Sequence, residues 1–173
     1  MLFQKIMSEN NSDEETIMNW RHVDAIDTNI LRVLQEHGRI TNAELAERVG
    51  LSPSPCLVRT KALERDGFIL RYTALLEPRA IGLSVSVFVQ VSLDRQAEHS
   101  LTAFEKAIAR RTEVMECYLM MGSSDYLLRV VVSDLDEFQI FVTGFLSKVP
   151  GVGSIRSSAA LKQVKYKTAL PLS

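Results

Sequence analysis

The chain has 173 residues, of which 46% are hydrophobic, and its formal net charge is −1 at pH 7. This apolar content is enough for one large domain or two small ones, which excludes a disordered or collagen-like chain. The near-neutral total charge excludes binding to nucleic acid through bulk positive charge, so any such contact must depend on a local patch.

The chain begins with a stretch that contains the polar and acidic run SENNSDEE, which offers little apolar surface for burial. We therefore expect residues 1–22 to form a disordered tail. A helix is predicted from Val23 to Gln35, because the apolar residues from Ile26 to Leu34 repeat at helical spacing. It ends at His37-Gly38 and supplies the additional helix that a helix-turn-helix pair needs to close a small core.

Two short helices follow, and the sequence marks their ends. Thr41 and Glu44 form a capping box, in which each side chain binds the backbone N–H group of the other residue. Gly50 ends the first helix, because glycine enters the left-handed region without a Cβ penalty. Ser52 is a good N-cap for the second helix, and Pro53 occupies the first helical position, where a missing N–H group costs nothing.

The second helix has a buried stripe and an exposed start. Cys56, Thr60 and Leu63 fall at positions i, i+4 and i+7, which predicts burial on one side. A short helix, a turn with glycine and a second helix with small and basic exposed residues are typical of a helix-turn-helix, whose second helix enters the major groove with its N-terminus first. An ordinary helical hairpin in another kind of domain is the alternative. The side chains expected to point outward are Ser54, Pro55, Val58, Arg59, Lys61 and Ala62.

After Gly67 the spacing of the apolar residues changes. The stretch from Phe68 to Leu76 is predicted to form short strands, as a wing or a bridge, before Pro78. Basic residues border this region, and we expect a positive edge that faces DNA, with a solvated helix face as the alternative. The DNA-binding domain is thus predicted to span residues 23–77, with a linker at 78–82. The basic residues are Arg59, Lys61, Arg65 and Arg71.

Residues 83–173 alternate between strand patterns and helices with one apolar face. The order strand, helix, strand, strand, helix, strand is typical of a ferredoxin-like βαββαβ domain, so the chain is predicted to have an α+β fold. The open face of the sheet is expected to be fairly apolar and to support a dimer. The predicted strands are 84–92, 114–121, 126–132 and 155–161, with 164–170 as an optional further strand, and the predicted helices are 101–111 and 135–146.

Other kinds of chemistry lack sequence signals. Cys56 and Cys117 lie outside any CxxC unit, and we expect two free core thiols in a reducing compartment. No apolar run is long enough to span a bilayer and no secretory signal is visible, which predicts a cytoplasmic protein with no membrane partner. The histidines lack metal-ligand spacing, and no phosphate-binding glycine loop or catalytic set stands out, so we expect no enzyme, metal or cofactor.

Two stretches resemble the Lrp/AsnC (leucine-responsive and asparagine regulator, or feast/famine) family. The DNA-binding half of that family is similar to LSPSPCLVRTKALERDGFI followed by YTALLEP, and its regulatory (RAM-type) domain is similar to CYLMMGSSDYLLRV followed by VPGV. The resemblance implies a winged helix-turn-helix domain joined to a dimerisation and effector-binding domain, in a bacterial or archaeal transcription regulator. It also implies homodimers that assemble further, often into octamers, with an amino-acid effector bound between dimers.

The resemblance assigns two sets of site residues, and it places the helix-turn-helix at about 42–61. The residues implied to contact double-stranded DNA are Ser52, Ser54, Pro55, Arg59 and Lys61. The residues implied to bind the effector are Leu119, Gly122, Asp125, Leu135, Ser158, Ala159 and Ala160.

The chemistry of an amino-acid site fits these residues. The turn around Gly122 offers backbone N–H groups to a carboxylate, and Asp125 offers a negative charge to an ammonium group. The alternative is an ordinary hairpin turn, in which Asp125 caps its own backbone. Met121 and the small residues 158–160 depart from the family pattern, so a preference for leucine is not implied.

Three functions remain open from the sequence. The leading hypothesis is a sequence-specific DNA-binding transcription regulator whose assembly and DNA binding respond to an amino acid. The second is an architectural protein that wraps DNA without a ligand. The third makes the C-terminal domain a small enzyme, because ferredoxin-like folds also host catalysts.

Overall fold

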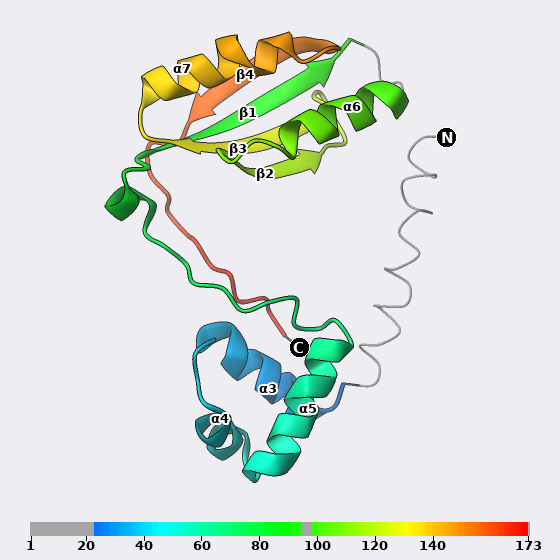
Figure 1. The fold of residues 1–173 in the computed structure, drawn as a ribbon, viewed down its shortest axis with the longest axis vertical. Coiled ribbons are helices and arrows are strands. Elements are labelled where there is room, and N and C mark those ends of the chain that lie inside the picture. The colour runs from blue at the N-terminus through cyan, green and yellow to red at the C-terminus, as the bar shows by residue number, and fades with distance from the viewer. Residues whose placement is uncertain (1–22, 95–97, 173) are drawn as a thin grey trace. The chain divides into compact units, whose positions relative to one another are not determined.

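The computed structural model describes residues 23–94 and 98–172, which form two compact units (Figure 1). One unit contains residues 23–75 together with residues 165–172, and the other contains residues 76–94 and 98–164. The tail expected at residues 1–22 lies outside the described residues. The sequence places all of residues 83–173 in a single domain, whereas the C-terminal residues instead group with the helical unit.

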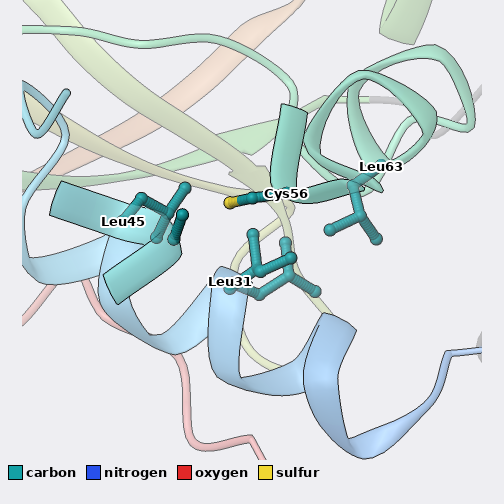
Figure 2. Packing of buried hydrophobic residues seen from close by; sticks show 6 residues of the cluster. Leu31, Leu45, Cys56 and Leu63 are labelled. Atoms are coloured by element: carbon teal, nitrogen blue, oxygen red, sulfur yellow. The ribbon is translucent and has the colours of Figure 1, made fainter. Parts of the chain in front are cut away.

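The helical unit consists of α3 (Ala25–Glu36), α4 (Asn42–Val49) and α5 (Pro53–Arg65), as the sequence predicts. Each helix contributes to one small apolar core, and Figure 2 shows its side chains meeting between the helices. The hydroxyl of Thr60 is buried there and donates a hydrogen bond to the Cys56 carbonyl at 3.0 Å, so this polar group is satisfied within its own helix. The core residues are Ile30, Leu31, Leu45, Ala46, Cys56 and Leu63.

The ends of α4 agree with the sequence, but the start of α5 does not agree fully. The Thr41 hydroxyl accepts the Glu44 N–H at 3.3 Å, and the Glu44 carboxylate accepts the Thr41 N–H at 2.9 Å, so the capping box is formed. Gly50 ends the helix in the left-handed region with φ of 72°. Ser52 occupies the N-cap position of α5, but its side chain makes no capping hydrogen bond. The proline at the first helical position already removes one N–H group that a cap would satisfy.

Two predicted strand regions are extended segments without strand pairing. Residues 68–77 contain no assigned strand, and the same holds for the optional strand at 164–170. Phe68 and Ile69 instead pack against the helical core, and Leu172 reaches the same core from the C-terminal segment. These segments are therefore attached to the helical core through a few side chains at their ends, and most of their length is exposed.

The second unit is a four-stranded antiparallel sheet in the spatial order β2-β3-β1-β4, with two helices. The chain order is strand, helix, strand, strand, helix, strand, which confirms the predicted βαββαβ arrangement. Short 3-10 turns precede β1 at Pro78–Ile81 and follow the second helix at Leu146–Lys148. The elements are β1 (Val85–Leu93), α6 (Glu98–Ile108), β2 (Val114–Leu119), β3 (Tyr126–Val132), α7 (Leu135–Gly144) and β4 (Val152–Ala159).

The two faces of the sheet differ in composition. On β1, Val87, Val89 and Val91 are almost completely buried, whereas Phe88 and Gln90 between them are exposed, as strand alternation requires. The pairing register places Arg129 and Arg156 on the same open face, because they lie opposite Phe88 and Gln90. The open face is thus mixed, and the expectation of a fairly apolar face is wrong.

The cysteines are both free thiols, but only Cys56 lies in a core. Cys117 is exposed on β2, which pairs with β3 and, among the described strands, forms one edge of the sheet. An edge strand is covered less completely than a central strand. The prediction that Cys117 is a core thiol is therefore wrong.

Candidate DNA-binding helix and effector site

The start of α5 is exposed, and its backbone is held from α4. Ser52, Ser54 and Pro55 are all exposed, as is Lys61 two turns further along the helix. The side-chain amide of Asn42 donates to the Pro53 carbonyl at 2.8 Å, which ties the first turn of α5 to the first residue of α4. Small, exposed side chains at the start of a helix allow it to approach DNA closely, as the second helix of a helix-turn-helix does in the major groove.

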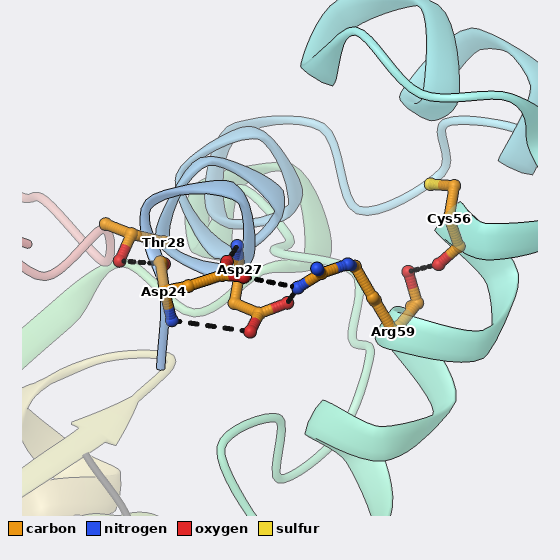
Figure 3. Close-up of polar contacts among 6 residues, drawn as sticks. Asp24, Asp27, Thr28, Cys56 and Arg59 are labelled. Atoms are coloured by element: carbon orange, nitrogen blue, oxygen red, sulfur yellow. Dashed lines mark hydrogen bonds and ion pairs between the residues drawn. The ribbon is translucent and has the colours of Figure 1, made fainter. Parts of the chain in front are cut away.

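Arg59 is half-buried and directed at α3 rather than into solvent. Figure 3 shows its guanidinium between two carboxylates, at 2.7 Å from Asp24 and 2.9 Å from Asp27. The pKa of Asp24 is lowered, first by the hydrogen bond from the Asp27 N–H and then by Arg59. The pKa of Arg59 is raised by its hydrogen bonds to Asp27 and Asp24. Both acidic residues stand out in the sequence only as charges that favour the start of a helix, so this ion-pair cluster was missed.

The expected positive edge is only partly available. Arg65 forms an ion pair with Asp66 at 2.8 Å, and Arg59 is held by two carboxylates, which leaves exposed Lys61 and Arg71 as the stronger sources of positive potential. The segment that follows α5 is attached to this helix by a side-chain hydrogen bond, which the Tyr72 hydroxyl donates to the Glu64 carboxylate at 2.9 Å. Burial, followed by this hydrogen bond, raises the pKa of Tyr72 to about 12.

The first group of predicted effector residues lies on the β2–β3 hairpin. Leu119 is the exposed last residue of β2, and Gly122 has φ of 146°, which favours glycine in the turn. Asp125 is 8% exposed, and one of its carboxylate oxygens accepts the Leu93 N–H at 2.7 Å. Its backbone also joins Val91 and Met120, so Asp125 ties the hairpin to β1. The side chain thus binds backbone in the neighbouring strand, a contact that the sequence did not reveal.

The second group lies where β4 ends and α7 begins. Leu135 is the first residue of α7 and is 61% exposed. Ser158 and Ala159 are the last residues of β4, and the N–H of Ala160 donates to the Ser86 carbonyl at 2.8 Å. These residues therefore border the beginning of β1, beside the end of β3.

The antiparallel register separates the two groups along the sheet. The first group is tied to Leu93 and Val91, whereas the second is tied to Ser86. Ser86 and Leu93 are seven residues apart on β1, which corresponds to about 23 Å at the rise of an antiparallel strand. One amino acid is too small to touch both groups in one subunit, so a site that uses all seven residues requires two copies of the chain.

A three-helix unit with a helix-turn-helix, joined to a ferredoxin-like domain, defines a two-domain DNA-binding transcription regulator. Residues 23–69 match the family model for a winged helix-turn-helix DNA-binding domain, and residues 86–170 match that for the Lrp/AsnC ligand binding domain. The chain belongs to the Lrp/AsnC family of transcription regulators.

Curated relatives and solved structures agree with this family. The leucine-responsive regulatory proteins of Klebsiella pneumoniae and Escherichia coli K12 are each 43% identical over 150 residues, which cover 87% of this chain and 92% of theirs. A transcriptional regulator from Neisseria meningitidis, solved in complex with L-Met, has 43% identity and a TM-score of 0.83 over 86% of this chain and 96% of that chain. An AsnC family regulator from Agrobacterium tumefaciens has 39% identity and a TM-score of 0.81 with the same coverage.

Among residues 23–94 and 98–172, every helix is too short or too polar to span a bilayer. Within the same residues, no group of three or more His, Cys, Asp or Glu side chains is arranged to hold a metal ion.

Proposed function

We propose that this protein binds specific DNA sequences through the exposed start of α5 and that an amino acid bound by the sheet unit alters this binding. The observation that carries the proposal is the exposed N-terminal turn of α5, held in place by a closed helical core and by the Asn42 contact. Support for the effector comes from relatives: one group is named for leucine, and one solved neighbour was crystallised with L-Met.

Direct DNA contacts are proposed for Ser52, Ser54, Pro55 and Lys61. The small side chains permit close approach of the helix start to base edges, and Lys61 supplies charge for a phosphate. Removing one phosphate contact lowers the salt slope of binding by about one unit. We expect this for Lys61→Ala in titrations with DNA from upstream of the protein's own gene. Lys148→Ala serves as the control, because it removes the same charge from an exposed lysine in the sheet unit.

The effector site is proposed to form between subunits. The hairpin group of one copy, with Gly122 and Asp125, would face the group around Ala159 of another copy, because one subunit holds them about 23 Å apart. The backbone N–H groups of the turn suit the carboxylate of an amino acid, and Asp125 suits its ammonium group. Homodimers that use the open sheet face and assemble to octamers would provide such contacts. Sedimentation velocity with and without amino acids tests this assembly, and an unchanged monomer in both conditions would rule it out.

A ligand-independent architectural role is the second candidate. It is favoured by the contact of Asp125 with the Leu93 N–H, because this carboxylate already has a structural partner. Calorimetry with each of the twenty amino acids separates the two functions, since heat from one of them excludes the ligand-free role. Both candidate functions place the protein in the cytoplasm, because it must reach DNA.

A further inference from the structure

We propose that Arg59 is a positioning residue that orients α5 on α3, and that it does not contact DNA. This inference deepens the proposed function and rests on DNA binding through α5. It departs from the assignment that the family resemblance gives to Arg59, and it follows from the cluster in Figure 3.

The charges around Arg59 oppose a phosphate contact. Its Nη1 atom lies 2.7 Å from Asp24 Oδ2 and 2.9 Å from Asp27 Oδ1, so one guanidinium faces two carboxylates. Two negative charges against one positive charge leave the cluster net negative, which repels a phosphate group. The Asp27 side chain is also only 16% exposed, so its attraction to Arg59 is screened by water less than that of a surface pair.

The carboxylates are themselves held by the first turn of α3. Asp24 Oδ1 accepts the Asp27 N–H at 2.8 Å, and the two residues form a reciprocal capping box. The Thr28 hydroxyl donates to the Asp24 carbonyl at 3.0 Å, which further fixes this turn. The capping box thus holds both carboxylates that Arg59 binds at the start of α3.

The buried stripe of α5 is supplemented by directional contacts to the other two helices. Its buried side chains, Cys56, Thr60 and Leu63, lie on one narrow stripe, and apolar contacts do not select direction as hydrogen bonds do. The Asn42 amide ties the start of the helix, and Arg59 ties its middle. Two directional contacts separated along one helix restrict its tilt and its rotation, and thus set where Ser54 and Lys61 point.

The decisive experiment compares the salt dependence of DNA binding among Arg59→Ala, Arg59→Lys and Lys61→Ala. We expect Arg59→Ala to weaken binding about tenfold at every salt concentration with an unchanged slope, whereas Lys61→Ala lowers the slope by about one unit. Arg59→Lys keeps a charge near both carboxylates and is expected to restore part of the affinity. A slope reduced by one unit in Arg59→Ala would overturn the proposal.

A double-mutant cycle without DNA tests the contact itself. Urea unfolding of Arg59→Ala, Asp27→Asn and the double variant is expected to show a coupling of about threefold or more in the unfolding equilibrium constant. Strictly additive effects on the unfolding free energy would overturn the proposal. If Arg59→Ala folds poorly, Arg59→Lys takes its place in the same cycle with Asp27→Asn. Absence of DNA binding by the unaltered protein would instead refute the proposed function and leave this cycle interpretable.

Discussion

The side-chain amide of Gln35 binds both backbone groups of Leu170, although the two residues are far apart in the sequence. Gln35 Oε1 accepts the Leu170 N–H at 2.6 Å, and Gln35 Nε2 donates to the Leu170 carbonyl at 3.2 Å. Leu172, two residues further on, packs against the helical core. The C-terminal segment is thus a component of the helical unit, even though it follows the last strand of the sheet unit.

The first prediction concerns this contact. Gln35→Ala removes both hydrogen bonds to Leu170 and is expected to lower the free energy of unfolding of the helical unit by about 1–2 kcal/mol. Urea denaturation measures the change, and Glu36→Ala, the exposed neighbour in α3, is the matched control. Equal effects of the two substitutions would show that the amide clamp does not stabilise the unit.

The second prediction compares the two N-caps of the helix-turn-helix. Thr41→Ala breaks a formed capping box and should cost about 1 kcal/mol, whereas Ser52→Ala removes a hydroxyl that makes no cap and should cost much less. Thermal melts of both variants give the comparison. A larger loss for Ser52→Ala would mean that its hydroxyl caps α5 in solution.

The third prediction separates the structural role of Asp125 from its proposed effector role. Asp125→Asn keeps an oxygen that can accept the Leu93 N–H but removes the charge offered to an ammonium group. We expect it to retain most stability and to lose amino-acid affinity by about tenfold or more. Asp125→Ala also leaves the Leu93 N–H without this acceptor and should cost about 1–3 kcal/mol in unfolding free energy.

Calorimetry and denaturation on the same samples check both parts of that comparison. Amino-acid binding by Asp125→Asn at unaltered affinity would exclude the carboxylate as the ammonium partner.

The fourth prediction concerns acid stability. The pKa of Asp24 is below its ordinary value of 3.8 in the folded protein, because the Asp27 N–H and Arg59 favour the ionised form. A lowered pKa contributes stability above the unfolded pKa, and this contribution is lost as the pH falls through the folded value. The unaltered protein should therefore be more stable than Asp24→Asn at neutral pH, and the difference should shrink below about pH 4. A difference that grows with acidity would contradict the assigned pKa shift. Melting curves between pH 7 and pH 3 supply the measurement.

Prediction from the sequence succeeded where the signals are local. The capping box of Thr41 and Glu44 lies within one turn, and Gly50 ends α4 through its own backbone freedom, so neither depends on distant residues. The strand from Tyr126 to Val132 was predicted with its observed bounds, because its apolar run ends in a turn on one side and polar residues on the other.

The errors concern neighbours that periodicity does not reveal. Cys117 lies in an apolar run that is typical of a buried strand, but β2 became an edge strand, which only the sheet order determines. Residues 68–77 have the composition of a strand, yet no described strand pairs with them, and Phe68 packs on the core instead. The sequence also contained no sign that Arg59 pairs with Asp24 and Asp27 at the start of α3.

The sequence alone determined the order of helices and strands and the approximate extent of α3, α4 and α5, because caps, turns and side-chain periods act over a few residues. The family was identified from the resemblance of two longer stretches. Only the tertiary structure decided which groups meet across long separations: Arg59 with Asp24 and Asp27, Asp125 with Leu93, and Gln35 with Leu170. Each of these contacts depends on packing that brings distant backbone together, and no pattern within a single helix or strand encodes that proximity.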